Sequence, residues 1–506
     1  MNVREMLKLE TKRRLHLVEL LYYADYPLSA DHLTNVLGCS LPALHKDVYA
    51  LNNEKFPLNI FKTKGGYIVQ FHSYASIDSL YAETLKTSLD FQVLKRLFFQ
   101  RFDTIQENAN YLNCSFSSFY SKLSPLNTLL EQWKIRLRNR PLRIAGNEEL
   151  LRHFYYLFFK EHRFSFQDYG FSSTLVHLVD QYIRVLLVNN QVKNTMNVHF
   201  YLMHNFLICL HRRRRRYKLN IDQADTSCLQ LPEKSEHSEL ILRIKMECRL
   251  IFNDNLSVEA LWPLFSGNLV LTAQQQDSLQ ENNKNLARFY SQHIRLLKSI
   301  NEASGNLLTE NEIQEALRHL GNELFIYYPK KRPIQILSQQ KKYSLLQLKK
   351  IYARPMNHLT TIIGKFLSRH RLPVFEETMD VYLYSLIVSI DNLLDRLSIQ
   401  EKPLTVLLLS DTSPNQERFW QNILKNWIGK SLDYHYHSYP FITQQELTRL
   451  TKNYDLLITD VTMPELESKC PIILINSYPT LKDFRSIQQF IDNYDQSFLT
   501  EEGKVV

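Results

Sequence analysis

The feature that most constrains this chain is a stretch that occurs twice, 75 residues apart and without a gap. Residues 29–52, SADHLTNVLGCSLPALHKDVYALN, align with residues 104–127, TIQENANYLNCSFSSFYSKLSPLN. Six positions are identical in the two stretches, and apolar residues match at two more. A self-match at a fixed offset indicates a duplicated structural unit. Each stretch is typical of a helix, a tight turn and a second helix, so we expect two helix-turn-helix units.

The first copy has the helix caps and the turn that such a unit requires. Residues 12–24 are amphipathic and predict a leading helix, and Ser29 and Ser40 are placed to cap the two helices that follow. A turn is expected at Gly38-Cys39. Residues 56–70, FPLNIFKTKGGYIVQ, contain two short β runs around a Lys-Gly-Gly turn, which is a hairpin signal. The hairpin completes a winged helix-turn-helix.

The second copy repeats this plan. Residues 90–100 predict its leading helix, while Thr104 and Ser115 are the expected caps. Residues 134–145, KIRLRNRPLRIA, alternate apolar and basic residues around a short turn, as the strands of a second wing would. We expect the apolar set to face the core, namely Ile135, Leu137, Leu142 and Ile144.

A recognition helix places its N-terminal residues against base edges in the major groove of DNA, and basic wings contact phosphates. In the first copy the candidate DNA-binding residues are Leu41, Pro42, His45, Lys46, Lys62 and Lys64. In the second copy they are Ser115, Phe116, Ser117, Ser118, Tyr120, Ser121, Lys122, Arg136, Arg138, Arg140 and Arg143. Neither helix is rich in the Arg, Asn and Gln that make bidentate base contacts, so we expect DNA shape and phosphate contacts to contribute heavily. The alternatives for these residues are a helical pair that serves only packing and a solvated outer strand face.

The charge distribution agrees with a DNA-binding front end. Residues 1–145 contain 19 Lys and Arg against 13 Asp and Glu, whereas residues 403–506 contain 9 against 13. The six cysteines show no CxxC pairing or metal-ligand spacing, and no run of about 18 apolar residues exists that would span a membrane. These features predict a cytoplasmic protein without a membrane segment, metal or cofactor.

With these motifs in view, the chain resembles the Mga-type virulence and metabolic regulators of Gram-positive bacteria. The second motif shows the resemblance most clearly, in FDTIQENANYLNCSFSSFYSKLSPLN and the wing that ends in RIAGNEE. The resemblance implies a mostly α, multidomain fold with two PTS-regulation-like helical domains and an enzyme IIB-like α/β domain. The implied boundaries are 1–75 and 76–147 for the winged motifs, 148–275 and 276–401 for the helical domains, and 402–506 for the α/β domain.

The middle of the chain is helical throughout by its periodicity. Eight helices are expected at residues 149–162, 172–189, 197–217, 236–252, 276–299, 310–327, 345–370 and 374–397. In the family, such domains accept a phosphoryl group on histidine from the sugar phosphotransferase system and form dimer contacts. The phosphorylation candidates are His199 and His204, with His319 and His358 as weaker ones; the alternative for each is an ordinary core or surface histidine. Five arginines, residues 212–216, end the third of these helices, which favours a solvated helix end or a domain-interface clamp.

The tail changes to short apolar runs that alternate with helical segments, which predicts an open parallel sheet with helices on its faces. An enzyme IIB component has a phosphocysteine in the loop after its first strand, but here that loop reads SDTSPNQ, residues 410–416, and contains no cysteine. The tail is therefore expected to be an interaction or dimerisation module. A receiver domain using Asp411 or Asp460 is disfavoured because the paired acids and lysine are missing.

The sequence as a whole predicts a non-enzymatic transcription regulator that binds double-stranded DNA as a homodimer, with phosphotransferase-system phosphocarrier proteins as further partners. The alternative is a sugar-phosphotransferase-linked signalling protein whose front end binds protein rather than DNA. A hydrolytic or metal enzyme has no support, since neither a glycine-rich phosphate loop nor GxSxG nor HExxH is present.

Overall fold

The computed structural model describes residues 3–53, 56–219, 221, 229–399, 403–413, 415–428, 432–436, 443–463 and 466–502. The chain divides into two compact units. Unit 1 contains residues 1–291, 320–343 and 375–378, and unit 2 contains residues 292–319, 344–374 and 379–506. Each unit is described by itself below.

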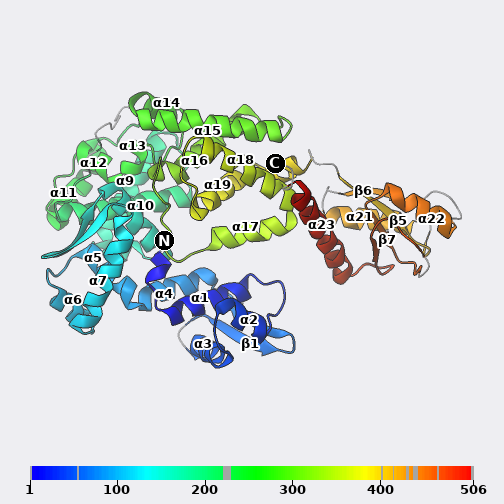
Figure 1. Cartoon of the computed structure of the whole chain (residues 1–506). Helices are drawn as coiled ribbons and strands as arrows, with labels where there is room; N and C mark the ends of the chain where they lie inside the picture. Colours follow the sequence, from blue (N-terminus) through cyan, green and yellow to red (C-terminus); the bar gives the residue numbers. More distant parts are fainter. Residues whose placement is uncertain are drawn as a thin grey trace. The chain divides into compact units, whose positions relative to one another are not determined.

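Unit 1 begins with the first winged helix-turn-helix, which is coloured blue in Figure 1. Its elements are α1 (Leu9–Tyr22), α2 (Ala30–Leu37), α3 (Leu41–Asn53), β1 (Leu58–Thr63) and β2 (Gly66–Phe71). The Ser29 hydroxyl caps α2 by accepting a hydrogen bond from the His32 amide, as its sequence position predicts. The wing strands pair antiparallel from Leu58 opposite Phe71 to Thr63 opposite Gly66.

The second winged helix-turn-helix follows and repeats the same order. Its elements are α5 (Leu89–Phe99), α6 (Ile105–Tyr111), α7 (Phe116–Glu131), β3 (Ile135–Asn139) and β4 (Leu142–Gly146). Thr104 and Ser115 cap α6 and α7 with their side chains, which confirms both expected caps. A helix that was not predicted, α4 (Ile77–Thr87), joins the two copies and packs against α1.

The duplication extends to details that only a common backbone geometry explains. Gly38 and Asn113 occupy equivalent positions in the two turns, and both adopt left-handed backbone conformations with φ of 60° and 51°. Asn52 and Asn127, also equivalent, bond to their wings: Asn52 pairs with both backbone groups of Ile60, and Asn127 accepts from the Leu137 amide. In both copies this asparagine bonds the recognition helix to the first strand of the wing, although Leu137 lies two positions beyond the counterpart of Ile60.

The remainder of unit 1 is largely helical. It includes α8 (Glu148–Glu161), α9 (Ser173–Asn189), α10 (Met196–Arg214), α11 (Ser238–Cys248), α12 (Asp254–Ala260), α13 (Trp262–Phe265) and α14 (Ala273–Asn282). The arginine run at the end of α10 is partly a clamp to the second copy. The Arg212 guanidinium is 1% exposed, donates to both carboxylate oxygens of Glu148 at 2.9 and 2.7 Å, and reaches the Ile144 carbonyl of β4.

Four helices are divided between the two units, namely α15 (Lys284–Ala303), α16 (Glu310–Leu324), α17 (Gln340–Ile351) and α19 (Glu376–Ser389). Helices α18 (Ala353–Arg369) and α20 (Leu393–Ile399) belong to unit 2. The short 3-10 helices among the described residues are η1 (Val3–Met6), η2 (Phe166–Tyr169), η4 (Lys234–His237), η5 (Phe325–Tyr327) and η6 (Thr451–Asn453).

Three predicted long helices are wrong because each is interrupted. The helix expected over 345–370 breaks at Tyr352, three residues before Pro355, whose missing N–H is tolerated in the first turn of a new helix but not in a helix interior. The helix expected over 276–299 breaks at Asn283, whose side chain accepts from the Leu286 amide and caps α15. The helix expected over 374–397 breaks before Asn392, which has a φ of 53°.

The C-terminal part of unit 2 is the α/β arrangement that the sequence predicts. Its elements are β5 (Leu404–Leu409), α21 (Gln416–Ile428), β6 (Leu432–Tyr436), α22 (Gln444–Leu450), β7 (Leu456–Thr459), β8 (Ile472–Leu474) and α23 (Leu481–Glu502). The four strands are parallel in the order β6-β5-β7-β8. Trp420 and Leu424 of α21 and Ile487 of α23 bury one face of this sheet.

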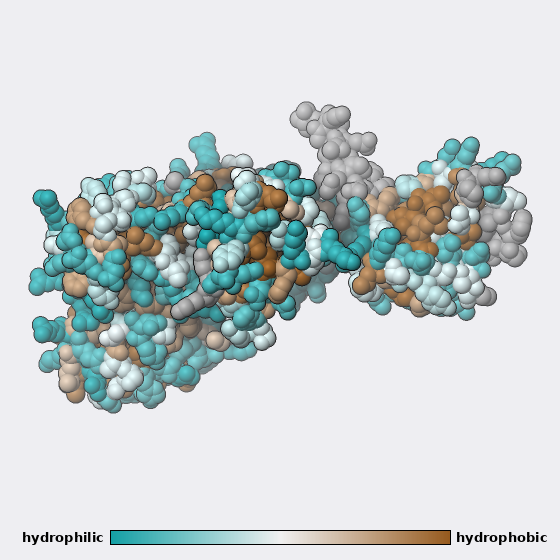
Figure 2. All heavy atoms as spheres, turned by 90° about the horizontal axis from the view of Figure 1, so that it is seen from below, coloured by the Kyte–Doolittle hydropathy of each residue, from teal (hydrophilic) through white to brown (hydrophobic). Residues whose placement is uncertain are grey.

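The surface mixes hydrophilic and hydrophobic residues on the face seen in Figure 2. Large exposed apolar side chains include Trp427 and Tyr478 in the C-terminal part. Among the described helices, none is long and apolar enough to cross a membrane. Within the same residues, no group of three or more His, Cys, Asp or Glu side chains is arranged to hold a metal ion.

Candidate nucleic-acid interface

The recognition helix of the first copy, α3, buries one face and exposes the other. Leu44 and Leu51 are buried in the core of this copy. The candidates Leu41, Pro42, His45 and Lys46 are all exposed on the N-terminal half of the helix. The Lys46 ammonium lies 3.6 Å from Glu10, but both side chains are more than half exposed, so this pair constrains Lys46 weakly.

The recognition helix of the second copy, α7, presents an aromatic pair at its N-terminal end. The rings of Phe116 and Tyr120 stack with centroids 5.8 Å apart, and both side chains are about half exposed. Ser117 and Ser121 are also exposed. The Ser115 hydroxyl caps the helix and hydrogen-bonds the Ser117 and Ser118 hydroxyls. An exposed stacked pair at the start of a recognition helix can contact thymine methyl groups and the apolar edges of bases.

Lys122 differs from its predicted role as a base contact. Its ammonium forms an ion pair with Asp90 at 3.0 Å, and the two side chains are 19% and 6% exposed. Ser118, one turn before Lys122 on the same side of α7, is also half-buried. A residue paired to its own leading helix is not available to a base edge without breaking a largely buried ion pair. Lys122 therefore lies on the inner face of α7, and its predicted position on the face that reads DNA is wrong.

The same position in the first copy has the opposite charge. Asp47 is equivalent to Lys122, and it accepts hydrogen bonds from Arg13 and Arg14 of α1 at 2.5 and 3.1 Å. Both copies therefore join their leading and recognition helices through an ion pair, but the signs are reversed. The sequence does contain a signal for this feature, because Asp47 and Lys122 are an acid and a base 75 residues apart. The predictions above do not include this charge reversal.

The second wing follows the predicted alternation. Ile135, Leu142 and Ile144 are buried, and Leu137 is half-buried. Arg136, Arg138 and Arg140 are exposed, and among the described residues none of the three pairs with an acid. Arg143 lies opposite Arg138 in the strand register and is half-buried with its Nε enclosed, so it extends less into solvent.

The first wing offers fewer cations. Lys62 and Lys64 are exposed at the hairpin end, and the Lys62 ammonium lies 6.0 Å from the ring centre of Tyr67. Gly66 has a φ of 137°, and a Cβ at this position would lie 2.2 Å from the Leu28 carbonyl oxygen. The hairpin therefore contacts the segment before α2 closely, which orients this wing relative to the recognition helix.

The histidine candidates lie in different environments. His199 on α10 is 14% exposed, with its Nε2 at 2.6 Å from Asp180, and Asp180 also pairs with Arg184. Burial raises the pKa of Asp180, but the hydrogen bonds from Arg184 and His199 outweigh it and hold that pKa below its ordinary value. This arrangement leaves Nδ1 of His199 as the nitrogen that Asp180 does not occupy.

His204 is enclosed in the helical core. It is 0% exposed, its Nδ1 lies 2.8 Å from the Tyr169 hydroxyl, and burial lowers its pKa to about 3. A phosphoryl donor protein needs to approach the imidazole directly, so this position does not suit the predicted role. His319 is half-buried, and His358 is exposed on α18.

The comparisons with known proteins agree with the winged geometry of the second copy. The sequence model of the Mga helix-turn-helix domain matches residues 73–159, which include α4, all of the second copy and most of α8. The second copy is similar to the helix-turn-helix domain of the Mga regulators. The matched domain covers the second copy alone, and the first copy is related to it by the internal repeat.

Three bacterial proteins with the names of regulators are similar to this chain over nearly its full length. A putative trans-acting regulator of Streptococcus pneumoniae is 20% identical over 92% of this chain and 94% of its own length. The capsule synthesis positive regulator AcpB of Bacillus anthracis is 19% identical over 96% and 99% of the two chains. The anthrax toxin expression trans-acting positive regulator of the same organism is 21% identical over 95% and 98%. The names of these proteins are those of regulators, not enzymes.

Proposed function

We propose that this chain binds duplex DNA through both winged helix-turn-helix copies and regulates transcription at the sites it binds. The observation that supports this most directly is the second copy, where an exposed aromatic pair on the recognition helix adjoins a wing with three exposed arginines that have no acidic partner among the described residues. Cations of this kind bind phosphates, while the helix addresses the groove. The positive regulators among its relatives support the same role.

The second copy is the main contact in this proposal, and the first copy adds a weaker one. The second wing has three exposed arginines, whereas the first has two exposed lysines. Arginine binds phosphate through a planar fork with two parallel hydrogen bonds, and lysine binds as a point charge. Base discrimination is expected to be modest because the N-terminal halves of the two recognition helices contain no Arg, Asn or Gln.

The experiment uses the full chain, since the front end is bonded to later segments. The Trp133 indole donates to the Arg332 carbonyl at 2.9 Å, and the Val3 amide donates to the Gln335 carbonyl at 3.1 Å. A duplex of about 30 base pairs is titrated at several salt concentrations, and binding that weakens steeply with salt supports the proposal. The alternative, a signalling protein whose front end binds protein, predicts no duplex binding at any salt concentration.

We further propose that the helical residues 148–275 and 276–401 are PTS-regulation-like domains, and that phosphocarrier proteins modify His199. The Asp180–His199 contact turns Nε2 toward the carboxylate and leaves the nucleophilic lone pair on Nδ1. Nδ1 is enclosed by the surrounding residues, so the proposal requires a local opening around α10 before a donor can reach it. A His199→Ala variant should lose phosphoryl incorporation from phosphoenolpyruvate with enzyme I and phosphocarrier protein. His177→Ala is the control, because His177 lies on α9 and is exposed; equal incorporation in wild type and His199→Ala excludes His199.

The last domain, residues 402–506, is proposed as an enzyme IIB-like module that serves association of two copies rather than phosphoryl transfer. The loop after β5 contains hydroxyls where a thiolate would be required: Ser410 and Thr412 donate to Asp460 at 2.9 and 2.7 Å. Strand β8 at the sheet edge exposes Ile472 and Leu474. Light scattering of the full chain should give the mass of a dimer, and charged residues at these two positions should lower it.

A further inference from the structure

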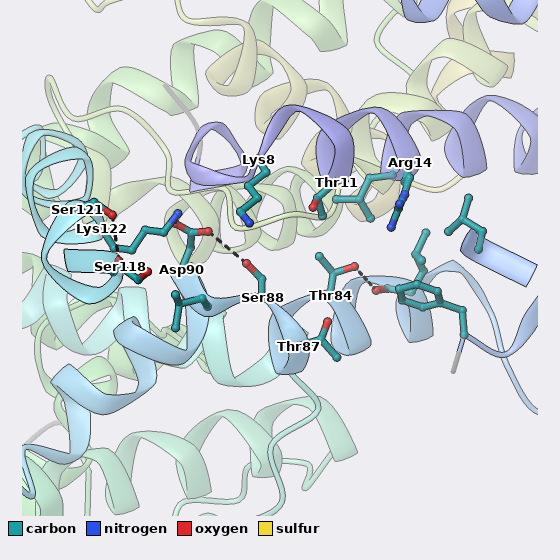
Figure 3. Close-up of a pocket in the computed structure, with 15 residues that line it drawn as sticks. Lys8, Thr11, Arg14, Thr84, Thr87, Ser88, Asp90, Ser118, Ser121 and Lys122 are labelled. Carbon is teal, nitrogen blue, oxygen red and sulfur yellow. Dashed lines mark hydrogen bonds and ion pairs between the residues drawn. The ribbon is translucent and has the colours of Figure 1, made fainter. Parts of the chain in front are cut away.

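A cavity of about 520 Å³ lies between the two winged copies in unit 1. It is bounded by α1, the residues around the end of α3, the junction of α4 and α5, and the inner face of α7 (Figure 3). Its volume is within the range of small-molecule sites. The lining residues are Lys8, Thr11, Arg14, Leu15, Leu51, Phe56, Leu80, Thr84, Thr87, Ser88, Leu89, Asp90, Ser118, Ser121 and Lys122.

The lining has more positive than negative charge. It contains three cations, Lys8, Arg14 and Lys122, and one carboxylate, Asp90. Lys122 and Asp90 neutralise each other at 3.0 Å, and Arg14 shares Asp47 with Arg13. Lys8 has an exposed side chain that, among the described residues, forms no ion pair. Figure 3 shows Lys8 directed from α1 toward Ser88 and Asp90, so a ligand anion would meet an available ammonium.

Four of the six hydroxyl groups in the lining already donate their hydrogens within the protein and are left as acceptors. Thr84 and Thr87 donate their hydroxyl hydrogens to the backbone carbonyls of Leu80 and Glu83, both at 2.8 Å. Ser121 donates to the Ser118 carbonyl, and Ser88 donates to Asp90. Because these hydrogens are already used, the oxygens can accept hydrogen bonds from a ligand. A ligand that satisfies them needs several donors of its own.

We propose that this cavity binds a small organic anion that bears several hydroxyl groups, of the chemical class of the sugar phosphates. The anionic group would pair with Lys8, the hydroxyls would donate to the Ser and Thr oxygens, and the carbon skeleton would lie against Leu15, Phe56 and Leu89. The junction of α4 and α5 supplies much of the lining but none of the proposed DNA contacts, which favours a small molecule over the DNA backbone as the source of the phosphate.

A bound ligand would touch both copies at once. Thr11 and Arg14 belong to the leading helix of the first copy and Lys8 immediately precedes it, whereas Ser118, Ser121 and Lys122 belong to the recognition helix of the second. Its occupancy would therefore alter the relative position of the two recognition helices and, through it, the affinity for DNA. This coupling to DNA rests on the function proposed above, whereas binding to the cavity does not.

The test is isothermal titration calorimetry of the full chain with glucose 6-phosphate, glucose and inorganic phosphate. Glucose 6-phosphate is expected to bind at least tenfold more tightly than either part alone, because only the whole molecule uses both the cation and the acceptors. Lys8→Ala should weaken this binding at least tenfold. Thr87→Trp, which fills the cavity from an exposed position without changing charge, should do the same. The control is Lys86→Ala. It also removes one lysine charge, but Lys86 precedes Thr87 and lies outside the lining, so binding should be unchanged.

Several results would overturn the assignment. These are no heat from glucose 6-phosphate, equal affinity for inorganic phosphate, or equal losses in Lys8→Ala and Lys86→Ala. Anisotropy with duplex DNA separates the two sources of phosphate: if Lys8→Ala weakens duplex binding in the absence of any sugar phosphate, the cavity takes the DNA backbone and the proposal is wrong. If glucose 6-phosphate binds as expected but no duplex does, the cavity assignment holds and the DNA-binding function fails.

Discussion

Replacement of the three exposed wing arginines, Arg136, Arg138 and Arg140, by alanine should reduce the salt dependence of DNA binding by a calculable amount. Each phosphate contact contributes about 0.9 to the slope of log Kobs against log salt, so three lost contacts should reduce the slope by about 2.7. From 50 to 200 mM salt, the variant should therefore lose about 40-fold less affinity than the wild type loses. Arg143 is left in place because it is half-buried.

The assay is fluorescence anisotropy of a labelled duplex titrated with the full chain at five or more salt concentrations. Two duplexes of unrelated sequence should give the same change in slope, since phosphate contacts contain little sequence information. The control variant replaces Lys193, Lys234 and Lys245 with alanine; these are exposed lysines of the helical part and carry the same total charge. A slope that does not change in the arginine variant, or that falls equally in the lysine variant, would refute the assignment of this wing to DNA.

Three further outcomes follow from the contacts described. Arg212→Met should destabilise the protein by about 3 kcal/mol, because it leaves the buried Glu148 carboxylate with fewer cations around it. Arg216→Met, at the exposed end of the same arginine run, should have little effect. Thermal melting measures the stability of both variants. Asn127→Ala should lower the free energy of unfolding by about 1 kcal/mol, because the Leu137 amide loses its hydrogen-bond acceptor, and it should weaken duplex binding. The control is Asn53→Ala, which should leave duplex binding intact because, in the described structure, this exposed residue bonds only within its own helix. Burial lowers the pKa of His204 to about 3 in the folded state, whereas the unfolded state binds a proton at this residue below about pH 6.5. As the pH is lowered below about 6.5, the free energy of unfolding should therefore decrease by about 1.4 kcal/mol per pH unit because of this residue. His204→Asn lacks that titration, so the melting temperatures of wild type and variant should converge from pH 7 to pH 5; a constant difference would contradict the reasoning.

The sequence was most informative where local chemistry determines structure. The caps at Ser29, Thr104 and Ser115 and the inward face of the second wing were predicted because hydroxyl caps and strand alternation depend on residues close in the chain. The turn at Gly38, where φ is 60°, belongs to the same group.

The contacts that escaped prediction are long-range. Arg212 was assigned to a helix end or a domain clamp without a partner, because its partner Glu148 lies 64 residues earlier and nothing local specifies the pairing. Lys122 was placed on the reading face because its helical position allows either side, and only the packing of α5 selects the inner one. The interrupted helices were missed for a different reason, since the helical period continues through the breaks at Asn283 and at Tyr352, where new helices begin.

The reversed ion pairs have a consequence for how a chain with two nearly equivalent halves folds. Adjacent copies of one motif can exchange helices during folding, and misassembly of this type is common in tandem repeats. If the leading helix of the second copy took the recognition helix of the first, Asp90 would face Asp47. The opposite exchange would place Lys122 against Arg13 and Arg14. Each wrong pairing brings like charges together in a poorly hydrated site, so each recognition helix is compatible only with the leading helix of its own copy.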